Sequence, residues 1–112
     1  MIFITGPLYS GKRTFAQNFP GRRICDVQDL AAGAKNLETL ADELSAYDVV
    51  LATEVGGGVV PMDPAQRAAR EAAGRLACLL AARAETVVQI WCGLPLVLKG
   101  TLPPRLPEAQ PR

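Results

Sequence analysis

The chain has 112 residues, of which 49% are hydrophobic, and this is enough for one ordinary domain with its own core. Its 12 basic and 11 acidic residues give a net charge of +1, which excludes the long-range field that attracts nucleic acid or an anionic membrane. No apolar run approaches the roughly 18 to 20 residues that span a bilayer, so we expect a cytoplasmic protein.

Histidine is absent from the sequence, which removes the commonest general base and the commonest metal ligand. The three cysteines, Cys25, Cys78 and Cys92, are widely spaced and form no C-x-x-C pair. Neither a disulfide framework nor a zinc site is therefore predicted, and we expect the three thiols to be buried.

The first half of the chain predicts two short strands and two helices. Residues 1–5 are an apolar run that leads into a glycine, which is typical of a parallel strand buried on both faces. A short helix follows over residues 12–18 and ends at residues 19–21, which read Phe-Pro-Gly. Residues 22–26 indicate a brief second strand, and the apolar spacing within residues 36–46 predicts an amphipathic helix.

The second half predicts two more strands and the longest helix. Residues 47–53 are the clearest strand, because the apolar run is continuous and rich in β-branched side chains. An aspartate followed by a proline starts a helix over residues 63–83. Residues 86–91 predict the last strand, after which we expect residues 93–100 to turn away from the sheet. The prolines of residues 101–112 predict a disordered tail.

This alternation predicts an α/β fold, with a small, mostly parallel sheet and helices on both faces, built from residues 1–100 as a single domain. Ligand sites in such sheets lie beyond the carboxyl ends of the strands. The loop after the first strand, Asp26, Glu54 and Gly93 all fall at that edge. The sequence therefore predicts one site there.

The loop after the first strand has the pattern G-x-x-x-x-G-K of a phosphate-binding P-loop, so the expected fold is P-loop NTPase-like. Glycines let backbone N–H groups surround a phosphate, and the following helix presents its positive end to the same anion. Lys12 would contact the outer phosphates during catalysis. The alternative is a plain glycine turn between a strand and a helix. The nucleotide-binding candidates are Gly6, Pro7, Leu8, Tyr9, Ser10, Gly11, Lys12, Arg13 and Thr14.

Arg13 stands where a P-loop has the serine or threonine that holds Mg²⁺. Thr14 does not replace that hydroxyl, because one further helical residue is turned by about 100° and raised by about 1.5 Å. Arg13 is either an exposed residue of the first helical turn or an added phosphate contact, since its planar guanidinium suits oxyanions.

Glu54 follows the clearest strand and is the second catalytic candidate. A carboxylate at this edge would orient Mg²⁺ or accept the proton of an attacking hydroxyl. The alternative is an acceptor that stabilises the loop by binding backbone N–H groups.

Several segments together resemble one known family. Residues 54–61 read E-V-G-G-G-V-V-P, a helix with arginines and Gly74 follows, and residues 93–96 read G-L-P-L after the last strand. With the glycine loop, they resemble the bifunctional adenosylcobinamide kinase / adenosylcobinamide-phosphate guanylyltransferase family over most of residues 1–100. The E-V-G-x-G-x-V-P segment is much more specific than the loop alone.

The resemblance implies an enzyme of cobalamin biosynthesis. ATP or GTP would phosphorylate the aminopropanol hydroxyl of adenosylcobinamide, and GTP would then donate GMP to the new phosphate. Asp26 would be the Walker B aspartate and, with Glu54, a Mg²⁺ ligand, although Asp26 reads equally as a cap of the following turn. Gly56, Gly58 and Pro61 would form a substrate-side loop, and the family association suggests a homo-oligomer.

Two departures from the family narrow the expected function. A large family segment between the loop helix and the second strand is missing, and the guanylyl-carrying histidine belongs to it. Arg13 replaces the metal-binding hydroxyl. We therefore expect the kinase activity in a truncated fold. The alternatives are a nucleotide- or corrinoid-binding module without catalysis, and guanylyl transfer by direct attack or from a lysine.

Overall fold

A computed structural model of the protein describes residues 1–54 and 63–102. The expected substrate-side loop, with Gly56, Gly58 and Pro61, lies outside the described residues, as does most of the expected tail. Everything below concerns the described ranges.

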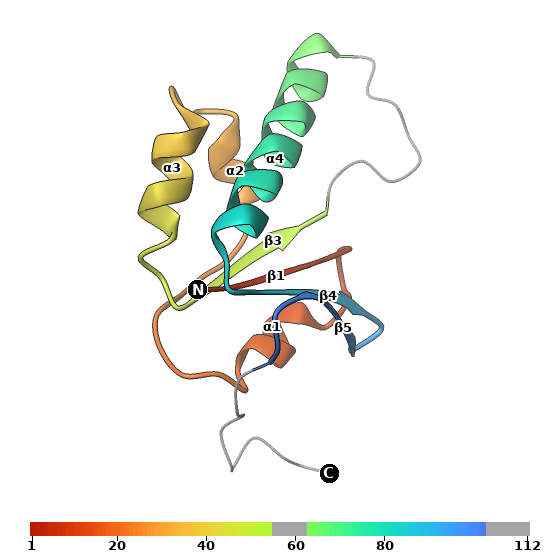
Figure 1. Cartoon of the computed structure of the whole chain (residues 1–112). Coiled ribbons are helices and arrows are strands. Elements are labelled where there is room, and N and C mark those ends of the chain that lie inside the picture. Colours follow the sequence, from red (N-terminus) through yellow and green to blue (C-terminus); the bar gives the residue numbers. More distant parts are fainter. Residues whose placement is uncertain (55–62, 103–112) are drawn as a thin grey trace.

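Five strands form one sheet in the order β2-β3-β1-β4-β5 (Figure 1). Strands β2, β3, β1 and β4 run parallel to one another, and β5 is antiparallel to β4. The strands are β1 (Ile2–Gly6), β2 (Arg23–Ile24), β3 (Val49–Thr53), β4 (Thr86–Trp91) and β5 (Leu94–Lys99). The predicted α/β fold with a mostly parallel sheet is confirmed.

The helices lie on both faces of this sheet, as predicted. In Figure 1, α1 lies on one side, and α2, α3 and α4 lie on the other. They are α1 (Lys12–Ala16), α2 (Gln28–Ala31), α3 (Leu37–Leu44) and α4 (Pro64–Arg83). The predicted start of α4 at Asp63 is confirmed, because its side chain accepts from Ala65 N at 2.9 Å. The cap of α3 was not predicted: the Asn36 side chain accepts from two backbone N–H groups. The one-turn helix α2 was not predicted.

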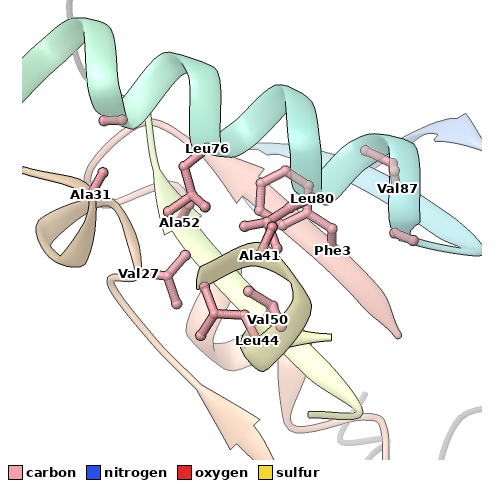
Figure 2. Packing of buried hydrophobic residues seen from close by; sticks show 12 residues of the cluster. Phe3, Val27, Ala31, Ala41, Leu44, Val50, Ala52, Leu76, Leu80 and Val87 are labelled. Carbon is pink, nitrogen blue, oxygen red and sulfur yellow. The ribbon is translucent and has the colours of Figure 1, made fainter. Parts of the chain in front are cut away.

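Each face of the sheet has its own hydrophobic core, because successive strand residues point to opposite faces. Phe3 of β1 packs with α2, α3 and α4, where Leu76 and Leu80 of α4 cover the sheet (Figure 2). Ile4, the next residue, packs with Phe15 of α1 on the other face. The central strand β1 is therefore fixed from both sides, and so is the loop that leaves its end.

The chain after β4 forms a hairpin, so the prediction that residues 93–100 turn away from the sheet is wrong. The two turn residues, Cys92 and Gly93, have φ angles of 50° and 77°. A two-residue turn with both φ angles positive matches the twist of adjacent antiparallel strands, so it returns the chain onto the sheet as β5. Pro95 fits because β5 is an edge strand.

The three cysteines are exposed, so the prediction of buried thiols is also wrong. Cys25 follows the two-residue strand β2, Cys78 lies on the outer side of α4, and Cys92 is in the hairpin turn. Cys25 and Cys92 lie in short connections and Cys78 lies on the solvent side of its helix, so none of these three side chains packs into a hydrophobic core. Among the helices that the structure describes, none combines the length and the apolar character needed to cross a bilayer.

Candidate functional site

The loop from β1 to α1 is shaped by two glycines that leave no room for a side chain. A Cβ on Gly6 would lie 2.6 Å from the backbone oxygen of Ile90 and 2.7 Å from Ser10 Oγ. Gly11 caps α1 with a φ of 89°, a conformation that favours glycine. Between them, Ser10 N donates to the oxygen of Pro7 at 3.2 Å. The predicted loop is thus compact and closed on itself.

The turn of the β4–β5 hairpin supports this loop from the side. Gly93 N donates to the oxygen of Ser10 at 2.7 Å, and a Cβ on Gly11 would lie 3.3 Å from Gly93 Cα. The hydroxyl of Ser10 is buried and has no partner among the described residues. Gly93 therefore belongs to the same edge as the loop, as the sequence predicted, and its role is to hold the loop.

The start of α1 leaves backbone donors at the end of the loop. The first bond of the helix runs from Phe15 N to the oxygen of Gly11, at 3.0 Å. The N–H groups of Lys12, Arg13 and Thr14 precede that bond, so they have no acceptor within the helix. These N–H groups can bind an anion at the mouth of the loop.

Lys12 is the most unusual side chain of the loop. Only 6% of the residue is exposed, and its Nζ donates to the oxygen of Pro7 at 3.2 Å. Burial lowers the pKa of this ammonium from its ordinary value, which Asp26 and Glu54 oppose and the neighbouring Arg13 reinforces. A buried ammonium that holds one carbonyl has donors left for a negatively charged ligand.

A cavity of ≈ 360 Å³ opens in front of Lys12. Its lining brings together the loop, α1 and the ends of β2 and β3. The lining residues are Leu8, Tyr9, Ser10, Gly11, Lys12, Arg13, Thr14, Asp26 and Thr53. Seven of the nine predicted nucleotide-binding residues line this cavity, together with Asp26. Gly6 and Pro7 are not part of the lining, and the Pro7 oxygen accepts from Lys12 Nζ.

Asp26 is joined to the loop by an ion pair. Arg13 Nη2 donates to Asp26 Oδ2, and Thr53 Oγ1 lies 3.5 Å from Asp26 Oδ1. Asp26 has a φ of 57°, a left-handed conformation that aspartate tolerates better than most residues. Asp29 N also donates to the Asp26 backbone oxygen at 3.1 Å, so the residue begins the turn into α2. The backbone of Asp26 thus belongs to the turn into α2, whereas its side chain contacts Arg13 and Thr53.

Glu54 lies at the same edge but outside the cavity lining. Its backbone N donates to the oxygen of Gly6 at 2.9 Å, which extends the pairing of β3 with β1. Its side chain is exposed, and Oε2 accepts from Gln89 Nε2 at 2.6 Å. Gln89 belongs to β4, so this contact reaches across β1 and fixes the carboxylate above the strand ends.

The arrangement does not fit the Mg²⁺ ion expected from the sequence. The Asp26 carboxylate is already paired with Arg13, and Glu54 is held by Gln89. In residues 1–54 and 63–102, no three acidic or cysteine side chains gather into a group that could hold a metal ion. Mg²⁺ binds to several oxygen ligands in near-octahedral geometry, and the position after Lys12 supplies a guanidinium instead.

Two residues of this site were not predicted. Thr53 ends the predicted strand 47–53, so its place at the carboxyl edge was a usable signal. Gln89 lies in the middle of a predicted strand, and no local pattern connects it with Glu54. Only the parallel register of β3, β1 and β4 brings the two side chains together.

Comparison with known proteins finds one family. The model of the family described as cobinamide kinase / cobinamide phosphate guanyltransferase matches residues 22–98. This is more than half of the chain and includes Asp26, Glu54 and the β4–β5 hairpin, whereas the glycine loop precedes it. No curated protein matches the sequence.

Proposed function

The chain belongs to the cobinamide kinase / cobinamide phosphate guanyltransferase family, and on this premise we propose that it is a nucleoside-triphosphate-dependent kinase of the adenosylcobinamide type. The family is enzymatic and acts in cobalamin biosynthesis. The resemblance drawn from the sequence is thereby confirmed at the level of the family. The choice of the kinase reaction, its nucleotide and its corrinoid substrate is our proposal.

The buried ammonium of Lys12 is the observation that carries the proposal. It lies in the glycine loop, lines the cavity and has one carbonyl contact through Nζ. Burying an ammonium is costly unless a partner compensates, so a lysine at this place favours a ligand with negative charge. The N–H groups at the start of α1 that have no acceptor within the helix also favour an anion, and a phosphate chain satisfies both requirements.

Phosphoryl transfer needs mainly positioning and stabilisation of charge, which this edge of the sheet can supply. Lys12 and the loop N–H groups would hold the outer phosphates of ATP or GTP. Glu54, with its carboxylate oriented by Gln89, would accept the proton of the substrate hydroxyl. The hydroxyl oxygen would form a bond to the terminal phosphorus as the bond to the departing ADP or GDP breaks. Because the residues do not fit Mg²⁺, none of these steps uses a metal ion.

Guanylyl transfer is not part of the proposal, because the 112 residues contain no histidine to carry the guanylyl group. A second candidate is a nucleotide- or corrinoid-binding module without catalysis. The exposed position of Glu54 outside the cavity lining favours this alternative. Both candidate functions require binding of a nucleotide or of the corrinoid, and only the kinase requires that the corrinoid be phosphorylated.

Titration calorimetry with ATP, GTP and adenosylcobinamide, followed by a phosphorylation assay, tests both candidates. The kinase requires binding of a nucleotide and formation of adenosylcobinamide phosphate. Glu54→Gln should keep nucleotide affinity and lower turnover by about 100-fold or more, since general bases contribute about 10²–10⁴. Glu43→Gln, an exposed position on α3, is the control and should do neither. Binding without turnover in the unmodified protein would leave the binding module.

A further inference from the structure

The residue after Lys12, where an ordinary P-loop has its metal-binding serine or threonine, is the cation Arg13. We propose that Arg13 takes the part of that metal ion, so that the phosphate chain of a nucleoside triphosphate binds as a metal-free anion between Lys12 and Arg13. The ligand class rests on the proposed function, and the metal independence goes beyond it.

The ion pair between Arg13 and Asp26 is the first observation. Asp26 is the carboxylate that the sequence offered for Mg²⁺, and its Oδ2 accepts from Arg13 Nη2. A divalent cation beside Asp26 would meet the positive guanidinium at close range, and like charges repel. The pair therefore satisfies the carboxylate and keeps a metal ion away from it.

The unused donors of Arg13 are the second observation. Within the described ranges, the side-chain contact of Arg13 is made through Nη2. A guanidinium has five N–H donors in a planar fork, and this fork matches the oxygens of a phosphate. Nε and Nη1 are consequently available to an oxyanion while Nη2 stays with Asp26.

The exposure of the pair is the third observation. The Arg13 side chain is 66% exposed and that of Asp26 is 38% exposed. A side chain this exposed can be reached by a phosphate while its Nη2 stays with Asp26. Its cavity is lined by two cationic side chains, Lys12 and Arg13, and by one carboxylate, Asp26. The surplus of positive charge suits an anion that brings no counter-ion with it.

Titration calorimetry of the intact chain with ATP, and separately with inorganic tripolyphosphate, tests the proposal in Mg²⁺ and in EDTA. For each ligand, the dissociation constant of the wild type in EDTA should lie within threefold of its value in Mg²⁺. Arg13→Ser restores the hydroxyl of an ordinary P-loop and should weaken binding in EDTA by at least tenfold. Arg75→Ser, exposed on α4, is the matched control and should bind as the wild type does.

Asp26→Asn gives a test of opposite sign. The Asp26 carboxylate lowers the positive charge that Lys12 and Arg13 present to a phosphate, so replacing it by a neutral asparagine should tighten ATP binding in EDTA by about three- to tenfold. If Asp26 is a metal ligand, the same change should weaken binding in Mg²⁺. Circular dichroism confirms that each variant is folded before titration.

The outcomes separate this proposal from the proposed function. Binding of ATP in Mg²⁺ but not in EDTA overturns the metal-free site and leaves the kinase standing. Tripolyphosphate and ATP binding in EDTA, lost in Arg13→Ser, supports the site even where adenosylcobinamide is not phosphorylated. Absence of binding in both buffers overturns both proposals.

Discussion

Replacing Lys12 by methionine separates a lysine that serves the fold from one that serves a ligand. Methionine keeps the length and most of the volume of the side chain and removes its charge. In the folded protein, the Lys12 residue is 6% exposed, its ammonium donates to the Pro7 oxygen at 3.2 Å, and burial lowers its pKa. The folded state without ligand therefore gains little from the charge.

The expected changes in stability and in binding have opposite signs. Losing the contact to Pro7 costs about 0.5–1.5 kcal/mol, whereas relief of the buried charge offsets or exceeds this cost. We expect Lys12→Met to have a free energy of unfolding between that of the wild type and about 1 kcal/mol above it. A hydrogen bond to a charged group is worth about 1.5–3 kcal/mol, so ATP affinity should fall by about 10- to 150-fold.

Urea unfolding and ATP titration on the same samples measure both quantities. Lys99→Met is the matched control, because Lys99 Nζ donates to the oxygens of Ala81 and Ala82, at 3.0 Å each, at the end of α4. It should lose about 0.5–1 kcal/mol of stability and no ATP affinity. ATP affinity of Lys12→Met within threefold of the wild type would refute the reasoning.

Three further predictions concern the loop, pH and the core. Gly11→Ala places a side chain at a φ of 89° and 3.3 Å from Gly93 Cα, so it should lower the free energy of unfolding in urea by about 1–2 kcal/mol and remove most of the ATP affinity. The control Gly74→Ala has open space in α4 and should raise the free energy of unfolding by up to about 1 kcal/mol. Because the pKa of Lys12 is lowered, ATP affinity measured by calorimetry should decrease as the pH rises, and this decrease should begin before pH 10.5 is reached. Over the same pH range the free energy of unfolding should increase, because the unfolded chain binds more protons than the folded chain. Lys12→Arg should move the decrease in affinity to higher pH, and a wild-type decrease that begins only above pH 10.5 would contradict this reasoning. Phe19 is 1% exposed and its ring contacts Phe15, so Phe19→Ala leaves a cavity and should lower the free energy of unfolding by about 3–5 kcal/mol in the same assay. A decrease under about 1 kcal/mol would show that the core on the α1 side of the sheet contributes little to stability.

Local patterns in the sequence predicted most of the fold. Residues 86–91 form β4 within the predicted limits, and the helices predicted over residues 36–46 and 63–83 are both present as α3 and α4. The strand β5 was missed because its side chains show no alternation and include a proline, although the Cys92-Gly93 turn before it was a signal. Helix α2 is one turn long, too short for a periodic pattern to identify it.

The candidate site was predictable where its residues are neighbours in sequence and not where they meet through the fold. Gly6, Gly11 and Lys12 lie within one loop, and their spacing alone indicated its shape. The contact of Arg13 with Asp26 depends on where β2 leaves the sheet relative to α1. Such a contact has no local signal in the sequence, and our proposal of a metal-free site depends on it.

The hydrogen bond from Gly93 to Ser10 also sets an order of events during synthesis of the chain. The glycine loop is synthesised before the hairpin turn that donates to its Ser10 oxygen, and most of the described sequence lies between the two. Contacts between such distant segments form late, because the intervening chain must first be ordered. The proposed phosphate site is thus completed only once β4 and β5 are in place, so we expect ligand binding to report on a chain that has folded almost to its last described strand.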